Sequence, residues 1–319
     1  MKPSESVSNS IAAVVRAGLL ARPKALPPWL FYDEAGSRFF EQITALPEYY
    51  LTRTERKILT LQAEEIIGRA AGEKRLHVVE LGSGTADKTR VLLRAAIERQ
   101  GTVLYEPVDV SASALELARS GIEGSMPGVH VLPRAGDYTQ GLRLNPPMEG
   151  ERRLVLYIGS SIGNFEPSEA QRVLRGVHQA LSPGDCLLLG VDQVKPESIL
   201  LSAYDDAAGV TATFNRNLLV RLNRELGAHF EISTFTHRAL WNSSENRVEM
   251  HLISGISQNI RIDALNESVD FAAGESIHTE NSYKYLPGQA EALLEGADFT
   301  PEIVWTDEAG WFAVHLARV

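Results

Sequence analysis

Residues 78–85 read Val78-Val79-Glu80-Leu81-Gly82-Ser83-Gly84-Thr85, and the rest of the chain can be interpreted outward from them. An apolar run ends in a carboxylate and is followed at once by a Gly-x-Gly turn. This order predicts a buried strand, a tight loop and a helix that begins near residues 86–88. Glycines lack the Cβ that would keep a ligand away from the backbone, and the free N–H groups at a helix start face the loop. We therefore expect a small-molecule site here.

Two acidic residues at this loop indicate the type of ligand. A dinucleotide fingerprint has a third glycine, and Asp87 stands where that glycine would fall. Glu80 lies two residues before Gly82 and would repel a pyrophosphate, but it suits a ligand with a cationic centre, such as S-adenosylmethionine (SAM). A Gly-x-Gly turn alone is equally typical of an ordinary strand-to-helix connection, so the other features of the chain have to decide.

Further strands with polar residues at their carboxyl ends follow the loop, as expected of an open α/β sheet that binds ligands at that edge. The strands are expected at 103–109, 129–132, 154–159 and 186–192, and helical patterns separate them at 88–100, 112–120 and 167–181. Asp109 ends the first of these strands, where such a sheet places a carboxylate that binds ribose. The alternation of strands and helices predicts an α/β fold.

A long insertion is expected after the fifth strand. Residues 197–227 have the pattern of one or two helices, and 230–241 and 247–256 have the pattern of a β-hairpin that turns at 242–246. A further β segment is expected at 259–264, and short final strands at 302–305 and 311–316 would complete the main sheet. Residues 196–283 therefore read as an insertion between the fifth and sixth strands of the sheet.

The lead-in before the first strand is rich in prolines and aromatic residues between 26 and 55. Thr52 or Thr54 is expected to cap a helix that runs through 57–68. Trp29 and Phe31 are expected to cover an edge of the sheet. Tyrosines differ from them, because a buried hydroxyl needs a hydrogen-bond partner.

The composition is that of an enzyme of the cytoplasm. The chain has 319 residues, 44% of them hydrophobic, and a net charge of −10, which argues against a nucleic-acid partner. It has no apolar run of membrane length and no signal-peptide pattern at 1–20. The single cysteine, Cys186, falls in an expected strand, which indicates a buried side chain and excludes an internal disulfide. The sequence has no pair of Cys or His residues at a spacing typical of a zinc site. We expect the protein to be a monomer.

Several longer motifs resemble the histidine-specific Nα-methyltransferases of ergothioneine biosynthesis. The motifs are residues 26–50, 82–85, Gly159-Ser160-Ser161-Ile162-Gly163-Asn164, 204–211 and 214–217. The resemblance implies SAM-dependent trimethylation of the α-amine of L-histidine, which gives hercynine. It also implies a class I (Rossmann-like) SAM-dependent methyltransferase sheet with an inserted α+β substrate-binding domain.

The resemblance also divides the chain. Residues 1–57 form a lead-in that contributes to both sites. Residues 58–195 together with 284–319 form the SAM-binding methyltransferase domain, and residues 196–283 form the domain that recognises the substrate.

The residues that the resemblance implies for SAM lie in the lead-in and around the sheet. They are Tyr32, Gly82, Lys88, Asp109, Asp137 and Tyr138. Asp109 suits the ribose hydroxyls, because an ionised carboxylate accepts two hydrogen bonds from a diol. Asp137 and Tyr138 suit the adenine, by hydrogen bond and by stacking. Lys88 can reach the methionine carboxylate, although its pattern is also that of a solvated helix face.

The residues that the resemblance implies for histidine are Tyr49, Gly159, Asn164, Tyr204, Met250, Glu280 and Ser282. Asn164 and Tyr204 would fix the α-amine and α-carboxylate, and Asn164 and Tyr32 are the candidate catalytic residues. Glu280 and Ser282 would read the imidazole, because an extended backbone points side chains at i and i+2 to one side. Met250 would act as a shape filter. The structural alternatives are surface charge for Glu280 and hairpin core for Met250.

His278, which is close to Glu280 in the sequence, is interpreted as an ordinary loop histidine. The chemistry itself demands little of the protein, because methyl transfer from a sulfonium to an amine is a direct displacement. Positioning can supply about 7–11 kcal/mol of such a barrier. We therefore expect no metal and no covalent intermediate, with water or Tyr32 as the route for the amine proton. Tyr32, Tyr49 and Tyr204 would face the nitrogen as its cationic character grows.

Three alternative functions remain open on the sequence. The first is an enzyme of the same fold that acts on another amino acid such as tryptophan, which Met250 and Glu280 disfavour because a larger uncharged ring has no use for a buried carboxylate. The second is a non-catalytic SAM-binding module. The third is a nicotinamide dehydrogenase, which Glu80 and the missing third glycine disfavour.

Overall fold

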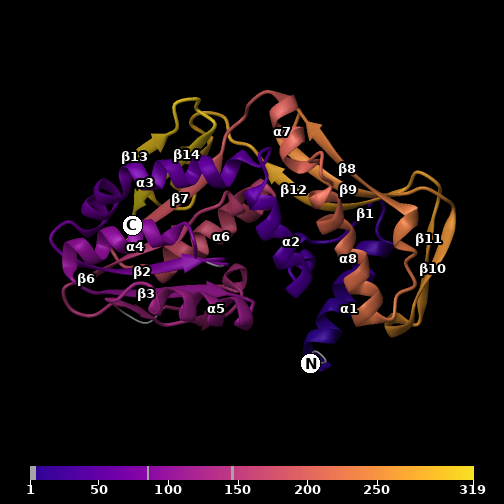
Figure 1. Ribbon diagram of the computed structural model, residues 1–319, viewed down its shortest axis with the longest axis horizontal. Helices are drawn as coiled ribbons and strands as arrows, with labels where there is room; N and C mark the ends of the chain where they lie inside the picture. Colours follow the sequence, from indigo (N-terminus) through magenta and orange to yellow (C-terminus); the bar gives the residue numbers. More distant parts are fainter. Residues whose placement is uncertain (1–4, 85, 145–146) are drawn as a thin grey trace. The chain divides into compact units, whose positions relative to one another are not determined.

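The computed structural model describes residues 5–84, 86–144 and 147–319. The chain forms two compact units. The sheet unit comprises Leu51–Val194 and Lys284–Val319, and the hairpin unit comprises Met1–Tyr50 and Lys195–Tyr283. The chain thus crosses between units after residues 50, 194 and 283, whereas the sequence placed the divisions after 57, 195 and 283. Figure 1 follows this path along the sequence by colour.

The sheet unit contains an eight-stranded sheet with the order β13-β14-β7-β6-β2-β3-β4, and β5 pairs with β3. All neighbouring strands are parallel except β14, which is antiparallel to both β7 and β13. The strands are β2 (Arg75–Leu81), β3 (Val103–Asp109), β4 (Val129–Val131), β5 (Arg134–Ala135), β6 (Glu151–Tyr157), β7 (Cys186–Asp192), β13 (Thr300–Thr306) and β14 (Phe312–Arg318). The expected α/β sheet, completed by two late strands, is confirmed.

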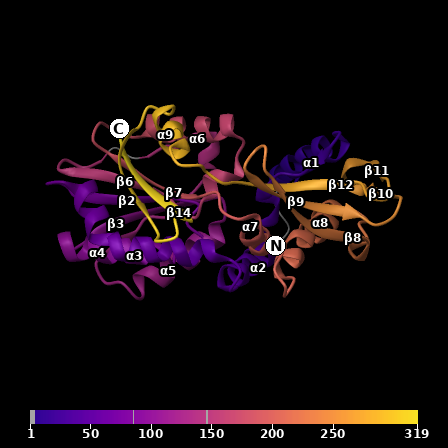
Figure 2. The same cartoon turned by 90° about the horizontal axis from the view of Figure 1, so that it is seen from above.

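Helices cover both faces of this sheet. The helices are α3 (Tyr50–Ala71), α4 (Thr89–Gln100), α5 (Ala112–Glu123), α6 (Pro167–Ala180) and α9 (Gln289–Glu295). Alternate strand residues pack into two cores, one shared with α3, α4 and α5 and the other with α6 and α9. Figure 2 shows these two helical layers on opposite sides of the strands. Because β7 is buried on both faces, its sequence is a nearly continuous apolar run, and Cys186 is buried as expected.

The hairpin unit contains a four-stranded sheet with the order β1-β12-β9-β8 and a separate pair, β10 and β11. Its strands are β1 (Lys24–Ala25), β8 (Phe235–Asn242), β9 (Arg247–Ser254), β10 (Gln258–Ile262), β11 (Glu267–Phe271) and β12 (Ser276–Tyr283). Its helices are α1 (Glu5–Leu20), α2 (Glu34–Ala45), α7 (Glu197–Tyr204) and α8 (Val210–Leu226). Both α7 and α8 contact β8 and β9, and α1 and α2 contact α8. The expected hairpin is confirmed, and the one or two helices expected before it are two, α7 and α8.

Two local expectations for the lead-in are wrong. Helix α3 begins at Tyr50, so Thr52 and Thr54 lie inside its first turns and do not cap it. Phe31 packs against Phe214 of α8, with 4.6 Å between ring centroids, and Trp29 is 43% exposed. Both aromatic residues belong to the hairpin unit, because a short 3-10 turn, η1 (Pro28–Phe31), directs Phe31 onto α8.

Candidate functional site

The glycine loop follows the carboxyl end of β2 and is hydrogen-bonded to the carboxyl end of β3. Gly82 and Gly84 have positive φ angles of 65° and 50°, a conformation that glycine adopts without strain. The Gly82 N–H donates to the Val108 carbonyl at 2.8 Å. The Asp109 carboxylate accepts from the Ser111 N–H at 2.9 Å and from the Gly84 N–H at 3.4 Å, so it borders the loop. Thr85 lies outside the described residues.

Glu80 has a different environment from the one that the sequence suggested. Its carboxylate is buried and accepts hydrogen bonds from the Thr89 hydroxyl, at 2.6 Å, and from the Tyr105 hydroxyl. Burial raises the pKa of Glu80 to about 7, although both hydrogen bonds favour the ionised form. Glu80 therefore ties β2 to β3 and to the first turn of α4 beneath the loop, and its carboxylate is occupied by these two donors.

Asp137 and Tyr138 lie close to the glycine loop. Asp137 caps a 3-10 turn, η2 (Tyr138–Gln140), by accepting from the Thr139 N–H at 2.9 Å. The Tyr138 hydroxyl lies 3.7 Å from the position that a Cβ on Gly82 would occupy, and its ring meets Tyr157 edge-on at 5.6 Å. The structure thus gathers Gly82, Asp109, Asp137 and Tyr138, four of the six residues predicted for SAM, at the carboxyl ends of β2, β3 and β5.

Lys88 and Gly159, which were predicted for different ligands, lie side by side. Lys88 precedes α4, and its ammonium pairs with Oε2 of Glu55 on α3. The Gly159 N–H, just past β6, donates to Oε1 of the same carboxylate at 2.7 Å. A Cβ on Gly159 would lie 3.1 Å from the Lys88 Nζ. The Lys88 side chain is 21% exposed and paired, so it is not a solvated helix face, and Asn164 ends the 3-10 turn η3 (Ser161–Asn164) that follows Gly159.

Glu55 is a functional candidate that the sequence interpretation missed. It is fully buried, and a Cβ on Gly190 of β7 would lie too close to its Oε1, so the glycine leaves room for the carboxylate. A signal was present: Glu55 falls at helical spacing from Leu51, Ile58 and Leu59, on the apolar face of α3. A carboxylate on such a face needs partners, which Lys88 and Gly159 supply.

In the hairpin unit, four residues predicted for histidine share one face of the small sheet. Glu280 pairs with Met250 and Ser282 pairs with Val248 in the register of β12 and β9, and directly paired residues lie on the same face. The Ser282 and Tyr204 hydroxyls share a hydrogen bond of 2.7 Å. Met250 is 2% exposed. Asn164 belongs to the sheet unit and Tyr204 to the hairpin unit, so their predicted pairing remains a prediction.

A buried chain of hydrogen bonds fixes the end of α7, where Tyr204 lies. The His237 Nε2–H donates to the Tyr204 carbonyl at 2.9 Å, and the Asn215 amide donates to His237 Nδ1 at 2.8 Å. Burial lowers the pKa of His237, which agrees with a neutral ring that donates from one nitrogen and accepts at the other. These hydrogen bonds could not be predicted from sequence patterns, because their members come from α7, α8 and β8.

The three tyrosines proposed to face the amine belong to one aromatic cluster of the hairpin unit. Tyr32 meets Phe40 at 5.8 Å, Phe40 meets Tyr49 at 6.3 Å, and Tyr49 meets Tyr204 at 6.3 Å between ring centroids. Tyr49 and Tyr204 are buried, whereas Tyr32 is 38% exposed. Tyr32, which was predicted for SAM, therefore lies among the residues predicted for histidine.

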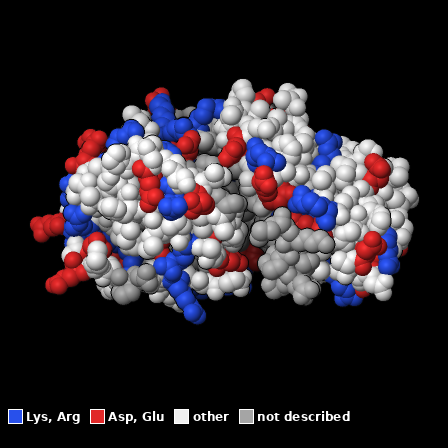
Figure 3. Space-filling view, turned by 60° about the horizontal axis from the view of Figure 1, so that its bottom comes forward, with Lys and Arg blue, Asp and Glu red and all other residues white. Residues whose placement is uncertain are grey.

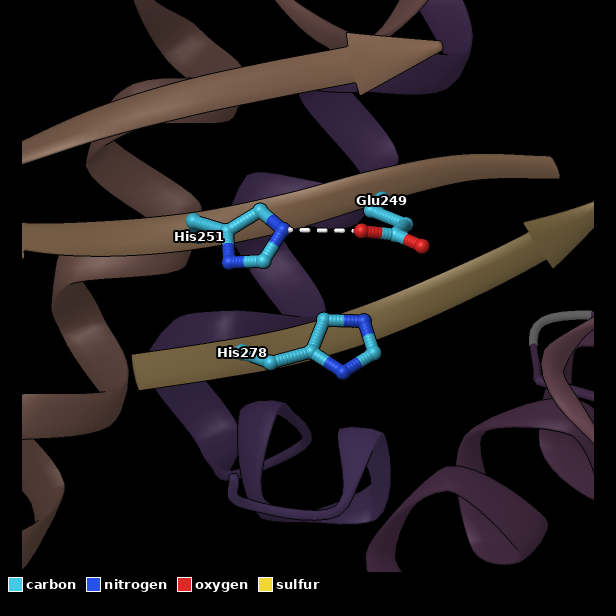
Figure 4. A group of neighbouring side chains, drawn as sticks. All are labelled: Glu249, His251 and His278. Carbon is cyan, nitrogen blue, oxygen red and sulfur yellow. Dashed lines mark hydrogen bonds and ion pairs between the residues drawn. The ribbon is translucent and has the colours of Figure 1, made fainter. Parts of the chain in front are cut away.

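Within the described part of the chain, one group of three side chains could hold a metal ion: Glu249, His251 and His278, shown in Figure 4. His251 Nε2 and Glu249 Oε2 are 3.1 Å apart. Partial burial of Glu249 would raise its pKa, but hydrogen bonds from Asn242, Arg247 and His251 outweigh this effect and lower the pKa to about 2. The three side chains already bind protein groups, and the expectation of a metal-free reaction stays a prediction.

The interpretation of His278 as a loop histidine is wrong. His278 lies within β12, its ring stacks on His251 with 4.9 Å between centroids, and its Nε2–H donates to the Glu280 carbonyl at 3.0 Å. The residue was misread because its stacking partner comes from the neighbouring strand.

The surface charge and the hydrophobicity of the helices are relevant to nucleic-acid and membrane partners. Basic and acidic side chains are interspersed on the face of the molecule drawn in Figure 3. Among the helices of the described residues, none combines the length and the apolar character needed to cross a membrane.

The chain is similar to several known proteins. A family described as "Histidine-specific methyltransferase, SAM-dependent" matches residues 11–319. The chain is 46% identical to the "Histidine N-alpha-methyltransferase" of Mycolicibacterium smegmatis, over 98% of this chain and 96% of that protein. It is 36% identical to the "Ergothioneine biosynthesis protein 1" of Neurospora crassa, over 64% of this chain and 23% of that protein. A crystal structure of a SAM-dependent methyltransferase from Clostridium acetobutylicum, 13% identical, aligns with a TM-score of 0.50 over 88% of this chain and 98% of that one, which shows the fold alone.

Proposed function

This chain belongs to the family of SAM-dependent, histidine-specific methyltransferases, and we propose that it transfers three methyl groups from SAM to the α-amine of L-histidine. The product is hercynine, and the reaction is the first step of ergothioneine biosynthesis. The observation that carries the proposal is the match to histidine methyltransferases over nearly the whole chain. The grouping of Met250, Glu280 and Ser282 on one face of the small sheet supports it.

The cofactor role falls to residues at the carboxyl ends of the main sheet. Asp109 binds the ribose hydroxyls, and its position beside Gly84 supports this role. Asp137 and Tyr138 bind the adenine. The Cβ-free backbone at Gly82 admits the ligand, and Lys88 binds the methionine carboxylate through a charge-assisted hydrogen bond.

The substrate role falls to the residues that the resemblance implies for histidine. Glu280 and Ser282 form hydrogen bonds with the imidazole nitrogens, with the Glu280 carboxylate as an acceptor. Met250 limits the size of the ring that the site can bind. Tyr204 binds the α-amine and α-carboxylate of the substrate, together with Tyr49, Gly159 and Asn164. A carboxylate beside the ring also favours its protonated form.

The reaction is a direct displacement at the methyl carbon. The neutral amine attacks, the nitrogen–carbon bond forms as the carbon–sulfur bond breaks, and S-adenosylhomocysteine leaves. The amine proton passes to water or to the Tyr32 hydroxyl, and Asn164 holds the nitrogen in line with the sulfur–methyl bond. The faces of Tyr32, Tyr49 and Tyr204 stabilise the methylated ammonium by cation–π interaction.

We further propose that the enzyme acts in the cytoplasm as a monomer, without nucleic-acid or membrane partners. The net charge of −10 supports the absence of a nucleic-acid partner. Light scattering during size-exclusion chromatography measures the mass directly, and a mass of two or more chains would contradict the monomer.

Mass spectrometry of reactions with SAM and each standard amino acid tests the function. We expect histidine alone to gain the mass of three CH₂ units, on its α-amine. Methylation of tryptophan in place of histidine would establish the alternative substrate. SAM binding without turnover on any amino acid would establish a binding module.

Glu280 distinguishes a histidine enzyme from a relative with another substrate. Replacing Glu280 by Gln removes a charged hydrogen bond to the imidazole, so we expect KM for histidine to rise about tenfold or more. KM for SAM should stay unchanged, and Glu245→Gln in the exposed hairpin turn is the matched control. An equal effect on both substrates would contradict the role of Glu280.

A further inference from the structure

Strand β12 changes register in its middle. Before the change, Ser276 pairs with Ile253 and His278 pairs with His251; after it, Glu280 pairs with Met250. Thr279 therefore stands as one extra residue on β12, which is the definition of a β-bulge.

Contacts of the side chains show which face each residue takes. We call the face with Arg247, Glu249 and His251 of β9 the outer face, and the face with Val248 and Met250 the inner face. His278 stacks on His251 and is therefore on the outer face (Figure 4).

The residues after the bulge alternate in the opposite phase. Ser282 shares a hydrogen bond with Tyr204 and pairs with Val248, so it lies on the inner face. Tyr283 accepts a hydrogen bond from Arg247 at 2.6 Å and lies on the outer face. His278 and Glu280 are two residues apart yet lie on opposite faces, which a regular strand does not allow.

Without the extra residue, the two imidazole-reading residues would be on the wrong face. In an uninterrupted register, Glu280 would pair with Glu249 and Ser282 would pair with Arg247. A slip of one residue moves every later side chain to the other face of the sheet. It would also place two carboxylates directly opposite each other, which is unfavourable.

Two side chains hold the bulge. Thr279 is 1% exposed, and its hydroxyl donates to the Met250 carbonyl at 3.0 Å. On the outer face, the His278 Nε2–H donates to the Glu280 carbonyl, and the His278 ring is supported by His251, which in turn bonds Glu249. The first hydrogen bond ties Thr279 to β9 at Met250, and the second fixes the carbonyl of Glu280, directly after the extra residue.

We propose that this bulge, with Thr279 and His278 as its positioning residues, sets the specificity for histidine by turning Glu280 and Ser282 to the inner face. The proposal rests on the proposed function, in which these two residues read the imidazole. Neither Thr279 nor His278 touches the substrate; each acts through the backbone of Glu280 or Met250.

The test replaces Thr279 by Val, which keeps the β-branched shape but removes the hydroxyl. The Met250 carbonyl then loses its buried donor, so we expect KM for histidine to rise about tenfold while KM for SAM stays within about twofold. Thr279→Ser retains the hydroxyl and should restore KM. Thr236→Val, at an exposed position of β8 in the same sheet, is the control.

A second variant keeps the test decisive if Thr279→Val does not fold. His278→Phe keeps the aromatic stack on His251 but cannot donate to the Glu280 carbonyl. We expect it to raise KM for histidine about fivefold, with SAM binding by calorimetry unchanged. All assays contain a chelator, because the side chains of Figure 4 could bind a metal ion. An unchanged KM for histidine in folded Thr279→Val or His278→Phe protein would overturn the proposal.

A double-mutant cycle distinguishes a role of Thr279 in positioning Glu280 from a general structural role. If Thr279 acts through Glu280, Thr279→Val should add little to the effect of Glu280→Gln on KM for histidine. Effects that multiply in full would show that Thr279 is merely structural. If Glu280→Gln alone leaves KM for histidine unchanged, the proposed role of Glu280 in binding the imidazole is wrong. If Glu280→Gln raises KM for histidine and Thr279→Val does not, only the bulge proposal is wrong.

Discussion

At the scale of single residues, the buried carboxylate of Glu55 holds two predicted ligand-binding groups, the Lys88 ammonium and the Gly159 N–H. Replacing Glu55 by Gln puts an amide donor against the Lys88 ammonium and removes its counter-charge. We expect Lys88 to shift and the Kd for SAM to rise about tenfold, the usual effect of a disrupted charged hydrogen bond. Calorimetric titration with SAM measures this. Glu64→Gln, exposed on the same helix, is the control, and equal SAM affinities for both variants would contradict the role.

Glu80 makes stability depend on pH. Burial raises its pKa from 4.5 to about 7, so the folded chain keeps a proton that the unfolded chain releases above pH 4.5. The stabilisation is fully present below that pH and is lost as pH rises through about 7, for a total of about 3 kcal/mol. Urea unfolding at pH 5 and pH 8 should show the wild type losing stability relative to Glu80→Gln. Parallel pH profiles for the two proteins would contradict this.

Residue roles were predictable where they depend on neighbours in the sequence. The positive φ angles of Gly82 and Gly84 follow from the strand–loop–helix pattern around them. The roles of Glu80 and His278 were misjudged because Tyr105 and His251, their partners, come from other strands. A local pattern shows that a carboxylate or an imidazole is present, but only the tertiary structure decides what it binds.

At the scale of elements, helix α2 begins at an N-cap that binds three donors. Asp33 accepts from the Gly36 N–H at 2.7 Å, from the Asn217 amide at 2.8 Å and from the Arg224 guanidinium at 2.7 Å. Burial would raise the pKa of Asp33, but these hydrogen bonds outweigh burial and lower the pKa. The stabilisation is therefore present above the ordinary pKa and is lost as pH falls through the lowered one.

Asp33→Ala should lower the free energy of unfolding by about 2 kcal/mol at neutral pH, at the upper end for an N-cap. The cap also fixes Tyr32, its neighbour in the sequence, so KM for histidine should rise as well. Urea unfolding and steady-state kinetics measure the two effects. Glu34→Ala, at the adjacent exposed side chain, is the control; a cost as small as that of the control would show that the cap is unimportant.

Elements were predictable because their hydrophobic periods are strong. The strands β3 and β7 have the expected bounds, and helix α6 ends one residue before its expected end. Spacing also predicted that Glu280 and Ser282 share a side. It could not predict which side, because that depends on the bulge at Thr279, and residues 278–282 are all polar, so they show no apolar alternation that would reveal a bulge.

At the scale of the whole molecule, the predicted cofactor and substrate residues divide largely between two compact units. SAM alone should therefore slow hydrogen exchange near Gly82, Asp109 and Tyr138 of the sheet unit. Histidine should add protection near Met250 and Ser282 of the hairpin unit. At a ligand concentration about 100 times Kd, binding contributes about 2.7 kcal/mol. Protection by SAM that is confined to the hairpin unit would contradict the division of roles.

The position of β14 has a consequence for the newly made chain. This strand lies between β7 and β13, and it is synthesised only after the whole of 195–283 has been made. Until then β7, apolar on both faces, has one edge without its neighbour, and such an edge can pair with other chains. Closing the sheet also joins segments far apart in the sequence, which slows folding. A nascent chain arrested before Phe312 should therefore be prone to aggregation and should remain bound to chaperones.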